Sequence, residues 1–424
     1  MSIPERHFSL RSVIWAAVLP TLVFSIGEGA IIPIIPVVAS DLGASLGVAG
    51  LVSAMIMVGE LFGDIPSGWV VSRIGERTAM ICASFLSVLG LLTALIAPNP
   101  WILAIGILLV GLATAVFALA RHAFMTSFVP LRYRARSLST LGGTFRLGYF
   151  IGPFISAGVI HLTGDARAVF WVHVATCLGA ALILILLPDP ASTFGPSRSG
   201  KRAGAEFVEQ EAQGLFQTIW LNRGVLTRLG TGAALIGAMR ASRQVILPLW
   251  AVSIGISDAN TALIIGIAGA VDFALFYASG QIMDRFGRMW TAMPSMIGLG
   301  IGHLALALTH DIDGRVAWFI GIAVFLSVAN GIGSGILMTL GSDLAPLDHP
   351  APFLGAFRFT GDAGSAAAPL AVSALTGAVT IAFAGGAMGV VGLLGAALLA
   401  RYIPRYVPHT AHRPKPVLPE DDAV

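Results

Sequence analysis

Twelve stretches of the chain are long and apolar enough to cross a lipid bilayer as helices. A membrane-spanning helix needs about 20 predominantly apolar residues, and each stretch reaches that length. They cover residues 12–38, 47–71, 78–97, 101–128, 136–162, 167–188, 222–252, 259–283, 289–309, 315–341, 352–377 and 379–400. The pattern predicts an all-α integral membrane protein with twelve transmembrane helices.

The longest polar interruption lies in the middle of the chain and separates six apolar stretches from six. It covers residues 189–221 and is rich in Pro, Gly, Ser and charged residues. We therefore expect a six-helix bundle over 1–188, a cytoplasmic linker over 189–221, a second six-helix bundle over 222–403 and a cytoplasmic tail over 404–424. The tail is rich in Pro and ends in acidic residues, so we expect it to be disordered.

The two halves of the chain resemble each other. When the sequence is shifted by 212 residues, half of its length of 424, Pro36 meets Pro248 and Gly43 meets Gly255. Further matched pairs are Gly68 and Gly280, Arg73 and Arg285, Gly75 and Gly287, and Arg146 and Arg358. Six helices restore the starting orientation, so the repeat is parallel. Two similar bundles about an axis along the membrane normal are an architecture of secondary transporters.

The charge of the chain supports a membrane protein and orients it. Only 11% of the residues are charged, whereas soluble globular proteins contain about 25%, which excludes a soluble enzyme and a nucleic-acid-binding protein. With both termini in the cytoplasm, 18 of the 25 Lys and Arg residues lie on the cytoplasmic side, as the positive-inside rule requires. Arg far outnumbers Lys, and Gly and Ala are abundant, which is typical of a GC-rich bacterial genome. We expect a monomer in the lipid bilayer of the bacterial inner (cytoplasmic) membrane.

The loop after the eighth stretch contains a characteristic group of Gly, Asp and Arg residues. Its positions are Gly280, Asp284, Arg285, Gly287 and Arg288. The loop resembles the cytoplasmic motif G-x-x-x-D-R-x-G-R of the major facilitator superfamily, and the loop after the second stretch retains Gly68, Arg73 and Gly75 of it. The resemblance implies that the acidic residue sits at the N-terminus of a helix in the other bundle, which favours an anion, and so latches the bundles together. Ser72 replaces the acidic residue in the first loop, so we expect the Asp284 latch to be the stronger one.

The fifth stretch contains small residues around a proline, with Gly148, Gly152 and Pro153 as the motif positions. It is similar to the G-x-x-x-G-P-x-x-G-G motif of the drug/proton antiporter branch of this superfamily, with Ser156 and Ala157 in place of the final glycine pair. Small residues four positions apart let helix backbones approach closely, so a plain packing role is the alternative. The resemblance implies the major facilitator fold, in which two bundles alternate access to a central site.

Ten ionisable residues lie within the apolar stretches, where charges are costly and usually face the bundle interior. They are Glu28, Glu60, Asp64, Asp272 and Asp362, and Arg121, Arg146, Arg240, Arg243 and Arg358. The 212-residue shift relates Glu60 to Asp272 and relates Arg146 to Arg358. In the fold that the chain resembles, helix 2 lies beside helix 11 and helix 5 beside helix 8. We therefore predict the cross-bundle pair Glu60–Arg358 and its equivalent, Arg146–Asp272. The alternative partner of Arg358 is Asp362, four residues along the same helix.

Helices 1, 4, 7 and 10 line a central cavity in the fold that the chain resembles. The polar residues that we assign to this substrate cavity are Glu28, Arg240, Arg243, Gln244 and Asn330. Glu28 is the preferred proton carrier, because a carboxyl group in a low-dielectric site can exchange a proton near neutral pH. Further candidates for proton coupling are Glu60, Asp272 and Asp362. The alternative for Glu28 is a permanent ion pair with Arg240, and for Asp64 we expect a structural pair with Arg121.

These features predict a secondary active transporter that works by alternating access. The motif of the fifth stretch and Glu28 favour proton-coupled efflux of small lipophilic or cationic compounds, as in multidrug resistance. The alternative is uptake or exchange of organic anions through an Arg-lined cavity, because Arg binds carboxylate and phosphate groups bidentately. The two functions can be distinguished by asking whether protein carboxylates neutralise Arg240 and Arg243. A non-transporting receptor on the same fold would show no flux of protons or substrate. The sequence contains no motif of an enzyme or of a metal site, so we expect no catalytic residues, no metal and no cofactor.

Overall fold

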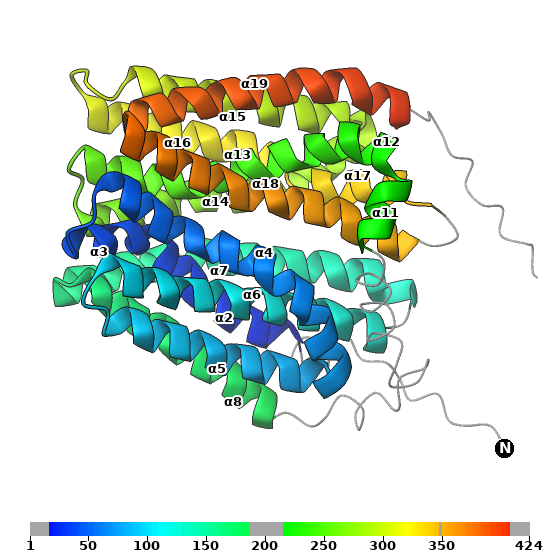
Figure 1. Cartoon of the computed structure of the whole chain (residues 1–424), viewed down its shortest axis with the longest axis horizontal. Coiled ribbons are helices and arrows are strands. Elements are labelled where there is room, and N and C mark those ends of the chain that lie inside the picture. The colour runs from blue at the N-terminus through cyan, green and yellow to red at the C-terminus, as the bar shows by residue number, and fades with distance from the viewer. Residues whose placement is uncertain (1–16, 130, 187–214, 347–349, 408–424) are drawn as a thin grey trace, which may run out of the picture.

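The computed structural model describes residues 17–129, 131–186, 215–346 and 350–407, and most of them lie in helices. No strand occurs among these residues, in agreement with the predicted all-α class. The long helices run roughly along the long axis of the molecule, as Figure 1 shows.

The helix bounds follow the predicted stretches closely. The first half forms α2 (Leu19–Ile31), α3 (Ile35–Asp41), α4 (Leu46–Ile74), α5 (Glu76–Leu95), α6 (Pro100–Phe128), α7 (Leu131–Thr163) and α8 (Val169–Leu186). The second half forms α11 (Leu215–Leu221), α12 (Arg223–Val225), α13 (Thr231–Ser253), α14 (Asp258–Phe286), α15 (Met289–Leu308), α16 (Arg315–Ile332), α17 (Ile336–Leu344), α18 (Pro350–Ala378) and α19 (Ile381–Tyr406). The short turn η2 (Ile32–Ile34) joins α2 and α3 into one crossing, and α16 and α17 together form another.

Ten of the described helical segments are long and apolar enough to span a membrane. The remaining two predicted crossings are α13, which carries Arg240 and Arg243, and α18, which carries Arg358 and Asp362. Charged side chains make these two helices less apolar, and such helices belong where the charges find partners inside the protein. The predicted twelve-helix membrane architecture is confirmed.

The internal repeat is visible in the bounds of α4 and α14. Both helices contain 29 residues, and both ends of α14 follow those of α4 by 212 positions. Gly75 follows α4 with a φ of 81°, and Gly287 follows α14 with a φ of 93°. Glycine adopts this conformation at no steric cost, which explains why both loop motifs have a glycine at this position.

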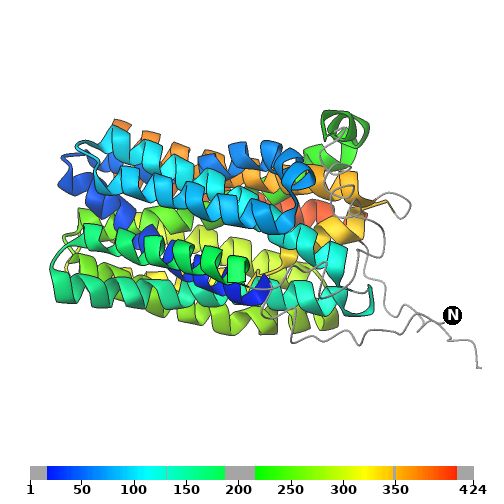
Figure 2. The same cartoon turned by 90° about the horizontal axis from the view of Figure 1, so that it is seen from below.

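The helices gather into two bundles. In the first, α2 packs on α7 and α8, and α6 packs on α4 and α5. In the second, α13 packs on α18 and α19, while α15 and α14 pack on α16. Between the bundles, α4 packs on α18 and α7 packs on α14. Figure 1 shows α18 beside α4, and Figure 2 shows the same arrangement from below. These are the neighbouring pairs of helices 2 and 11, and 5 and 8, that the sequence led us to expect.

The predicted linker and tail fall mainly on 187–214 and 408–424, which lie outside the described residues. The last part of the predicted linker is helical, since α11 forms there and packs on α18. The last helix also runs to Tyr406, beyond the predicted start of the tail. The reason is tertiary, because the Tyr406 hydroxyl accepts a hydrogen bond from Arg228 and so docks the last turn of α19.

The two bundles touch tightly at the end of the molecule where α4 begins. Ser373 Oγ on α18 donates a hydrogen bond to the carbonyl oxygen of Gly47 on α4 at 2.7 Å. A Cβ added to Gly47 would lie 2.7 Å from the Cα of Gly377, so the two backbones are in direct contact. We call this end the closed end. The loop motifs after α4 and α14 lie at the opposite end, which we call the motif end.

Candidate functional site

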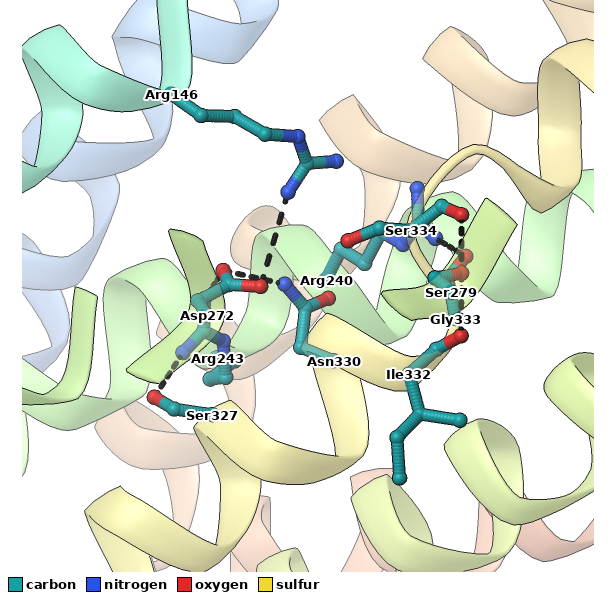
Figure 3. Close-up of polar contacts among 10 residues, drawn as sticks. All are labelled: Arg146, Arg240, Arg243, Asp272, Ser279, Ser327, Asn330, Ile332, Gly333 and Ser334. Carbon is teal, nitrogen blue, oxygen red and sulfur yellow. Dashed lines mark hydrogen bonds and ion pairs between the residues drawn. The ribbon is translucent and has the colours of Figure 1, made fainter. Parts of the chain in front are cut away.

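Three arginines and one aspartate meet between the bundles. Asp272 on α14 accepts a hydrogen bond from Arg243 of α13 at 3.1 Å and faces Arg146 of α7 at 3.7 Å. Asn330 Nδ2 on α16 donates to the same Asp272 Oδ2 at 2.7 Å. Figure 3 shows these side chains pointing toward one another from both bundles. We call Arg146, Arg240, Arg243 and Asp272 the cationic cluster.

The two arginines of α13 have different partners. Arg243 donates to the Asp272 carboxylate and, through Nη1, to Ser327 Oγ at 2.8 Å. Arg240 Nη2 donates to the carbonyl oxygen of Gly333 at 2.5 Å. Within the described part of the chain, Arg240 forms no ion pair and its Nε has no hydrogen-bond partner. Protein carboxylates therefore neutralise Arg243 but leave Arg240 with a neutral partner only.

Four carboxylates and two arginines form a second group between α2, α4, α6 and α18. Arg358 on α18 pairs with Asp64 on α4 at 2.9 Å and with Asp362, one turn along its own helix, at 3.3 Å. Glu60 on α4 lies close to these groups and to Glu28. We call Glu28, Glu60, Asp64, Asp362, Arg121 and Arg358 the acidic cluster. The ten intramembrane charges are thus unevenly distributed, with surplus arginine in one cluster and surplus carboxylate in the other.

Glu28 is fully buried in the first bundle. Its Oε1 accepts a hydrogen bond from Thr114 Oγ1 of α6 at 2.9 Å, and its Oε2 has no hydrogen-bond partner among the described residues. The nearby polar groups are Arg121 and Tyr149. The alternative ion pair between Glu28 and Arg240 is absent, because Arg240 reaches the α16–α17 turn instead.

One of the two predicted cross-bundle pairs has its predicted partners, since Arg146 of α7 faces Asp272 of α14. At the α4–α18 contact, the partners of Arg358 are Asp64 and Asp362. The alternative partner Asp362 is thus present, and Arg358 also acts on the charge of Glu60, so the pair Glu60–Arg358 stays a prediction. Asp64 follows Glu60 by four residues, about 6 Å along the helix axis, so the axial offset between α4 and α18 decides which carboxylate lies nearer to Arg358.

Two further sequence predictions concern Asp64 and Gln244. Asp64 is bound by Arg358, and the Arg121 guanidinium lies over the Phe145 ring at 4.6 Å, so the expected pair of Asp64 and Arg121 stays a prediction. Gln244, assigned to the cavity, is half-buried on α13 beside Arg243.

The loop motif makes contacts within a bundle. Arg288 donates from Nε and Nη2 to the two carboxylate oxygens of Asp343 on α17, at 2.7 and 3.2 Å. This bidentate hydrogen bond raises the pKa of Arg288. Asp284 is exposed and forms no ion pair with the other bundle in the described residues, and Ser72 Oγ donates to the Trp69 carbonyl of its own helix at 2.9 Å. The expected latch at the motif end therefore stays a prediction, while the bundles touch at the closed end.

The motif of the fifth stretch is a packing surface for the first helix. A Cβ on Gly148 would overlap Ser25 Oγ of α2, and one on Gly152 would lie 2.5 Å from the Ile26 carbonyl oxygen. Pro153 lies within α7 directly after this contact. The small residues therefore hold α2, the helix that carries Glu28, directly against α7.

The break in the tenth crossing was not predicted. The α-helix α16 ends at Ile332 and α17 begins at Ile336, with Gly335 between them at a φ of 81°. The sequence does contain a signal, because three of the five residues over 331–335 are glycine and glycine clusters favour turns. The break matters for the site, since it turns the Gly333 carbonyl toward Arg240.

Comparison with curated proteins finds membrane carriers of small metabolites. The chain is 25% identical over 177 residues to probable inositol transporter 3 of Arabidopsis thaliana, over 40% of this chain and 30% of that protein. It is 25% identical over 333 residues to the cis,cis-muconate transport protein of Acinetobacter baylyi, over 77% of this chain and 78% of that protein. It is 26% identical over 189 residues to the galactose-proton symporter of Escherichia coli, over 44% of this chain and 40% of that protein. The chain thus spans less than a third of the inositol transporter.

Solved structures and family models agree on the fold. The crystal structure of a D-xylose-proton symporter matches with a TM-score of 0.72 and 17% identity, over 94% of this chain and 99% of that one. The model of the Major Facilitator Superfamily matches residues 18–369. The relatives named above transport sugars, inositol and muconate, so the superfamily is shown and the narrower drug/proton antiporter branch is not. The chain therefore belongs to the major facilitator superfamily, as a multi-pass secondary transporter and not an enzyme.

Proposed function

We propose that this chain is a proton-coupled transporter that carries a small organic anion by alternating access of its two bundles. The observation that carries this proposal is the surplus charge of the cationic cluster, in which Asp272 pairs with Arg146 and Arg243 and leaves Arg240 without an ion pair among the described residues. A substrate carboxylate would supply negative charge to the cluster. It would also contact both bundles, because Arg146 lies on α7 and Arg240 on α13.

Arg240 is the residue that we assign to substrate binding. Its partner is a neutral backbone carbonyl, whereas Arg243 is already bound to a carboxylate. A carboxylate brings an opposite charge to a guanidinium and can accept two parallel hydrogen bonds from it, which a single carbonyl oxygen cannot. A substrate carboxylate therefore competes for Arg240 against a weak partner and for Arg243 against a strong one.

Glu28 is the residue that we assign to proton coupling. Its carboxyl group is fully buried beside Thr114, Tyr149 and Arg121, so it is shielded from bulk water and surrounded by polar groups. Asp272 is held by Arg243 and Asn330, so we assign it to the structure of the cationic cluster. The neighbouring carboxyl groups of the acidic cluster, Glu60 foremost, would pass the proton to or from Glu28.

Two relatives support these assignments. The galactose-proton symporter couples its substrate to protons, as its name states. The cis,cis-muconate transport protein is similar over 77% of this chain, and muconate is a dicarboxylate. We use cis,cis-muconate below as a defined probe for a carboxylate substrate.

The acidic cluster favours a second candidate function. Its four carboxylates outnumber its two arginines, so a lipophilic cation would find opposite charge there. Proton-coupled efflux of such compounds would also agree with the antiporter-like motif in α7. The direction of transport and the sign of the substrate charge distinguish the two functions.

The test is transport by purified protein in proteoliposomes with an imposed pH gradient. We expect cis,cis-muconate to accumulate with inward proton movement, and tetraphenylphosphonium not to be extruded. Arg240→Gln should raise the half-saturation concentration for muconate by roughly 10-fold or more, since a hydrogen bond to a charged group contributes about 1.5–3 kcal/mol. Arg223→Gln, an exposed arginine beside Trp220, is the matched control and should transport normally. Extrusion of the cation with no muconate uptake would refute the anion proposal and support efflux.

A second variant isolates proton coupling. Glu28→Gln should abolish accumulation driven by the pH gradient but retain exchange of labelled for unlabelled muconate, because exchange needs no net proton movement. Gradient-driven accumulation at the wild-type level in Glu28→Gln would remove Glu28 from the coupling role.

We further propose that the protein is a monomer in the bacterial inner membrane, with both termini in the cytoplasm. The motif end then faces the cytoplasm, and the conformation described here is inward-facing, since the bundles touch at the closed end. A C-terminal tag should be cleaved by protease in inverted vesicles and protected in right-side-out vesicles. The reverse result would contradict this orientation.

A further inference from the structure

The tenth crossing is broken at the depth of the cationic cluster. The three residues between α16 and α17 are Gly333, Ser334 and Gly335. A break interrupts the regular ladder of backbone hydrogen bonds, and unsatisfied backbone groups inside a membrane protein are costly. Ile336 N–H still donates to the Gly333 carbonyl oxygen at 3.2 Å, and side chains from neighbouring helices supply the other hydrogen bonds to carbonyl oxygens at this break.

Two residues of other helices bind the carbonyl oxygens of the break. Ser279 Oγ on α14 lies 2.6 Å from the carbonyl oxygens of both Ile332 and Ser334. Arg240 Nη2 on α13 donates to the carbonyl oxygen of Gly333 between them. Figure 3 shows both side chains against this turn. Ser279 is fully buried, so no bulk water replaces it.

Arg240 therefore has two uses that compete. It holds the break through Gly333, and it is the arginine that we assign to a substrate carboxylate. Its Nη2 is directed at the carbonyl oxygen, and a carboxylate on the same guanidinium would add a negative charge and accept two parallel hydrogen bonds. Binding an anion thus removes one of the two side chains that hold the turn.

We infer that Arg240 and Ser279 form a latch on the break between α16 and α17, and that an anionic substrate opens it by drawing Arg240 away from the Gly333 carbonyl. This inference rests on the proposed function, because it takes the substrate to be a carboxylate bound at Arg240. Ser279 is a positioning residue, since it contacts the break and not the substrate. When substrate is bound, opening of the latch makes the tenth crossing more flexible at the break. Occupancy of the site is thereby coupled to movement of α17.

The far end of α17 determines which way it moves. Asp343, near its last residue, is held by the bidentate contact with Arg288 that follows α14. When the latch opens, α17 keeps this anchor at the motif end and loses the contact at the break. It therefore pivots about Asp343, so that the part nearest the substrate moves most.

The test is amide hydrogen exchange of peptides covering residues 331–337, measured by mass spectrometry on the full-length protein in nanodiscs. Without ligand, Ser279→Ala and Arg240→Met should each raise exchange in this segment by about fivefold, the effect of losing one net hydrogen bond. Ser279→Thr, which keeps the hydroxyl, should restore slow exchange. Ser84→Ala, which removes a buried serine bonded to its own helix in α5, is the control and should leave the segment unchanged.

The ligand arm uses cis,cis-muconate, with myo-inositol as the uncharged probe. Muconate should raise exchange in 331–337 of the wild type toward the level of Arg240→Met and have no further effect in that variant, whereas inositol should not raise it. Ligands usually slow exchange where they bind, so acceleration confined to this segment is diagnostic. Unchanged or slower exchange with muconate, or unchanged exchange in both variants, overturns the latch.

Transport measurements separate this inference from the proposed function. Ser279→Ala should change the maximal rate of muconate transport while leaving its half-saturation concentration within about twofold, because the substrate contacts stay in place. Muconate transport that depends on Arg240, with no exchange response in 331–337, would remove the latch and keep the proposed function. Faster exchange in the two variants without any muconate transport would remove the proposed function, and with it the substrate-driven opening.

Discussion

Replacing Gly152 with alanine tests how tightly the helix that carries Glu28 is held. A Cβ at this position would lie 2.5 Å from both the carbonyl carbon of Gly29 and the carbonyl oxygen of Ile26. Ordinary contact begins at 3.4 Å, so α2 and α7 would have to separate by about 1 Å, which is overpacking of the kind that strains a core. Both of these atoms belong to the backbone of α2, so no side chain can rotate to relieve the overlap.

The same helix supplies a matched control. A Cβ on Gly158 of α7 would meet nothing within 4 Å, so Gly158→Ala changes helix propensity alone and should stabilise by up to about 1 kcal/mol. Overpacking typically costs about 1–3 kcal/mol, and backbone overlap places Gly152→Ala at the upper end. After the same gain in propensity, we expect Gly152→Ala to be about 2 kcal/mol less stable than the wild type.

The assay is thermal unfolding of both variants in one detergent at one scan rate. The transition of Gly152→Ala should fall by about 4–8 °C, given about 2–4 °C per kcal/mol. That of Gly158→Ala should stay at or above the wild-type value. Equal shifts for the two variants would refute the close packing of α2 on α7.

Two further predictions concern charge pairs. In a double-mutant cycle on the free energy of unfolding, Arg358→Ala should couple to Asp64→Asn by about 0.5–1 kcal/mol, a value limited by the partial exposure of both groups. Its coupling to Glu60→Gln should be smaller. A larger coupling to Glu60→Gln would favour the pair predicted from the sequence. Asp343→Asn should lower the free energy of unfolding by about 1 kcal/mol at low salt, because Arg288 loses a bidentate carboxylate. This destabilisation should become smaller as the salt concentration is raised. A destabilisation that does not depend on salt would mean that the contact is not electrostatic.

The fold was largely predictable because its signals are local. The length of each apolar stretch indicates a crossing whatever surrounds it, and the 212-residue repeat aligned the ends of α4 and α14 residue for residue. Gly75 and Gly287, which the loop motif identified, have the positive φ that favours glycine. Where the helix ends differed, as at Tyr406, a contact from a distant part of the chain had extended the helix.

For the site, the sequence predicted which residues take part but not how they pair. The residues of both clusters were identified from charge inside apolar stretches, and the repeat selected the correct partner for Arg146. It did not identify Asp64 as a partner of Arg358, because Asp64 and Glu60 lie on adjacent turns of α4 and their order depends on the axial offset between two helices. The break in the tenth crossing was missed because a glycine-rich stretch permits a turn without requiring one.

The sequence by itself determined that this protein crosses the membrane twelve times, that its halves are related, and that ten charges lie inside it. Only the tertiary structure decided how those charges are grouped. It gathered surplus arginine around Asp272 and surplus carboxylate around Glu28, and it left Arg240 with a backbone carbonyl as its partner. The physical reason is that apolar length and glycine turns act within one helix, whereas the pairing of charges depends on the rotation and height of helices relative to one another.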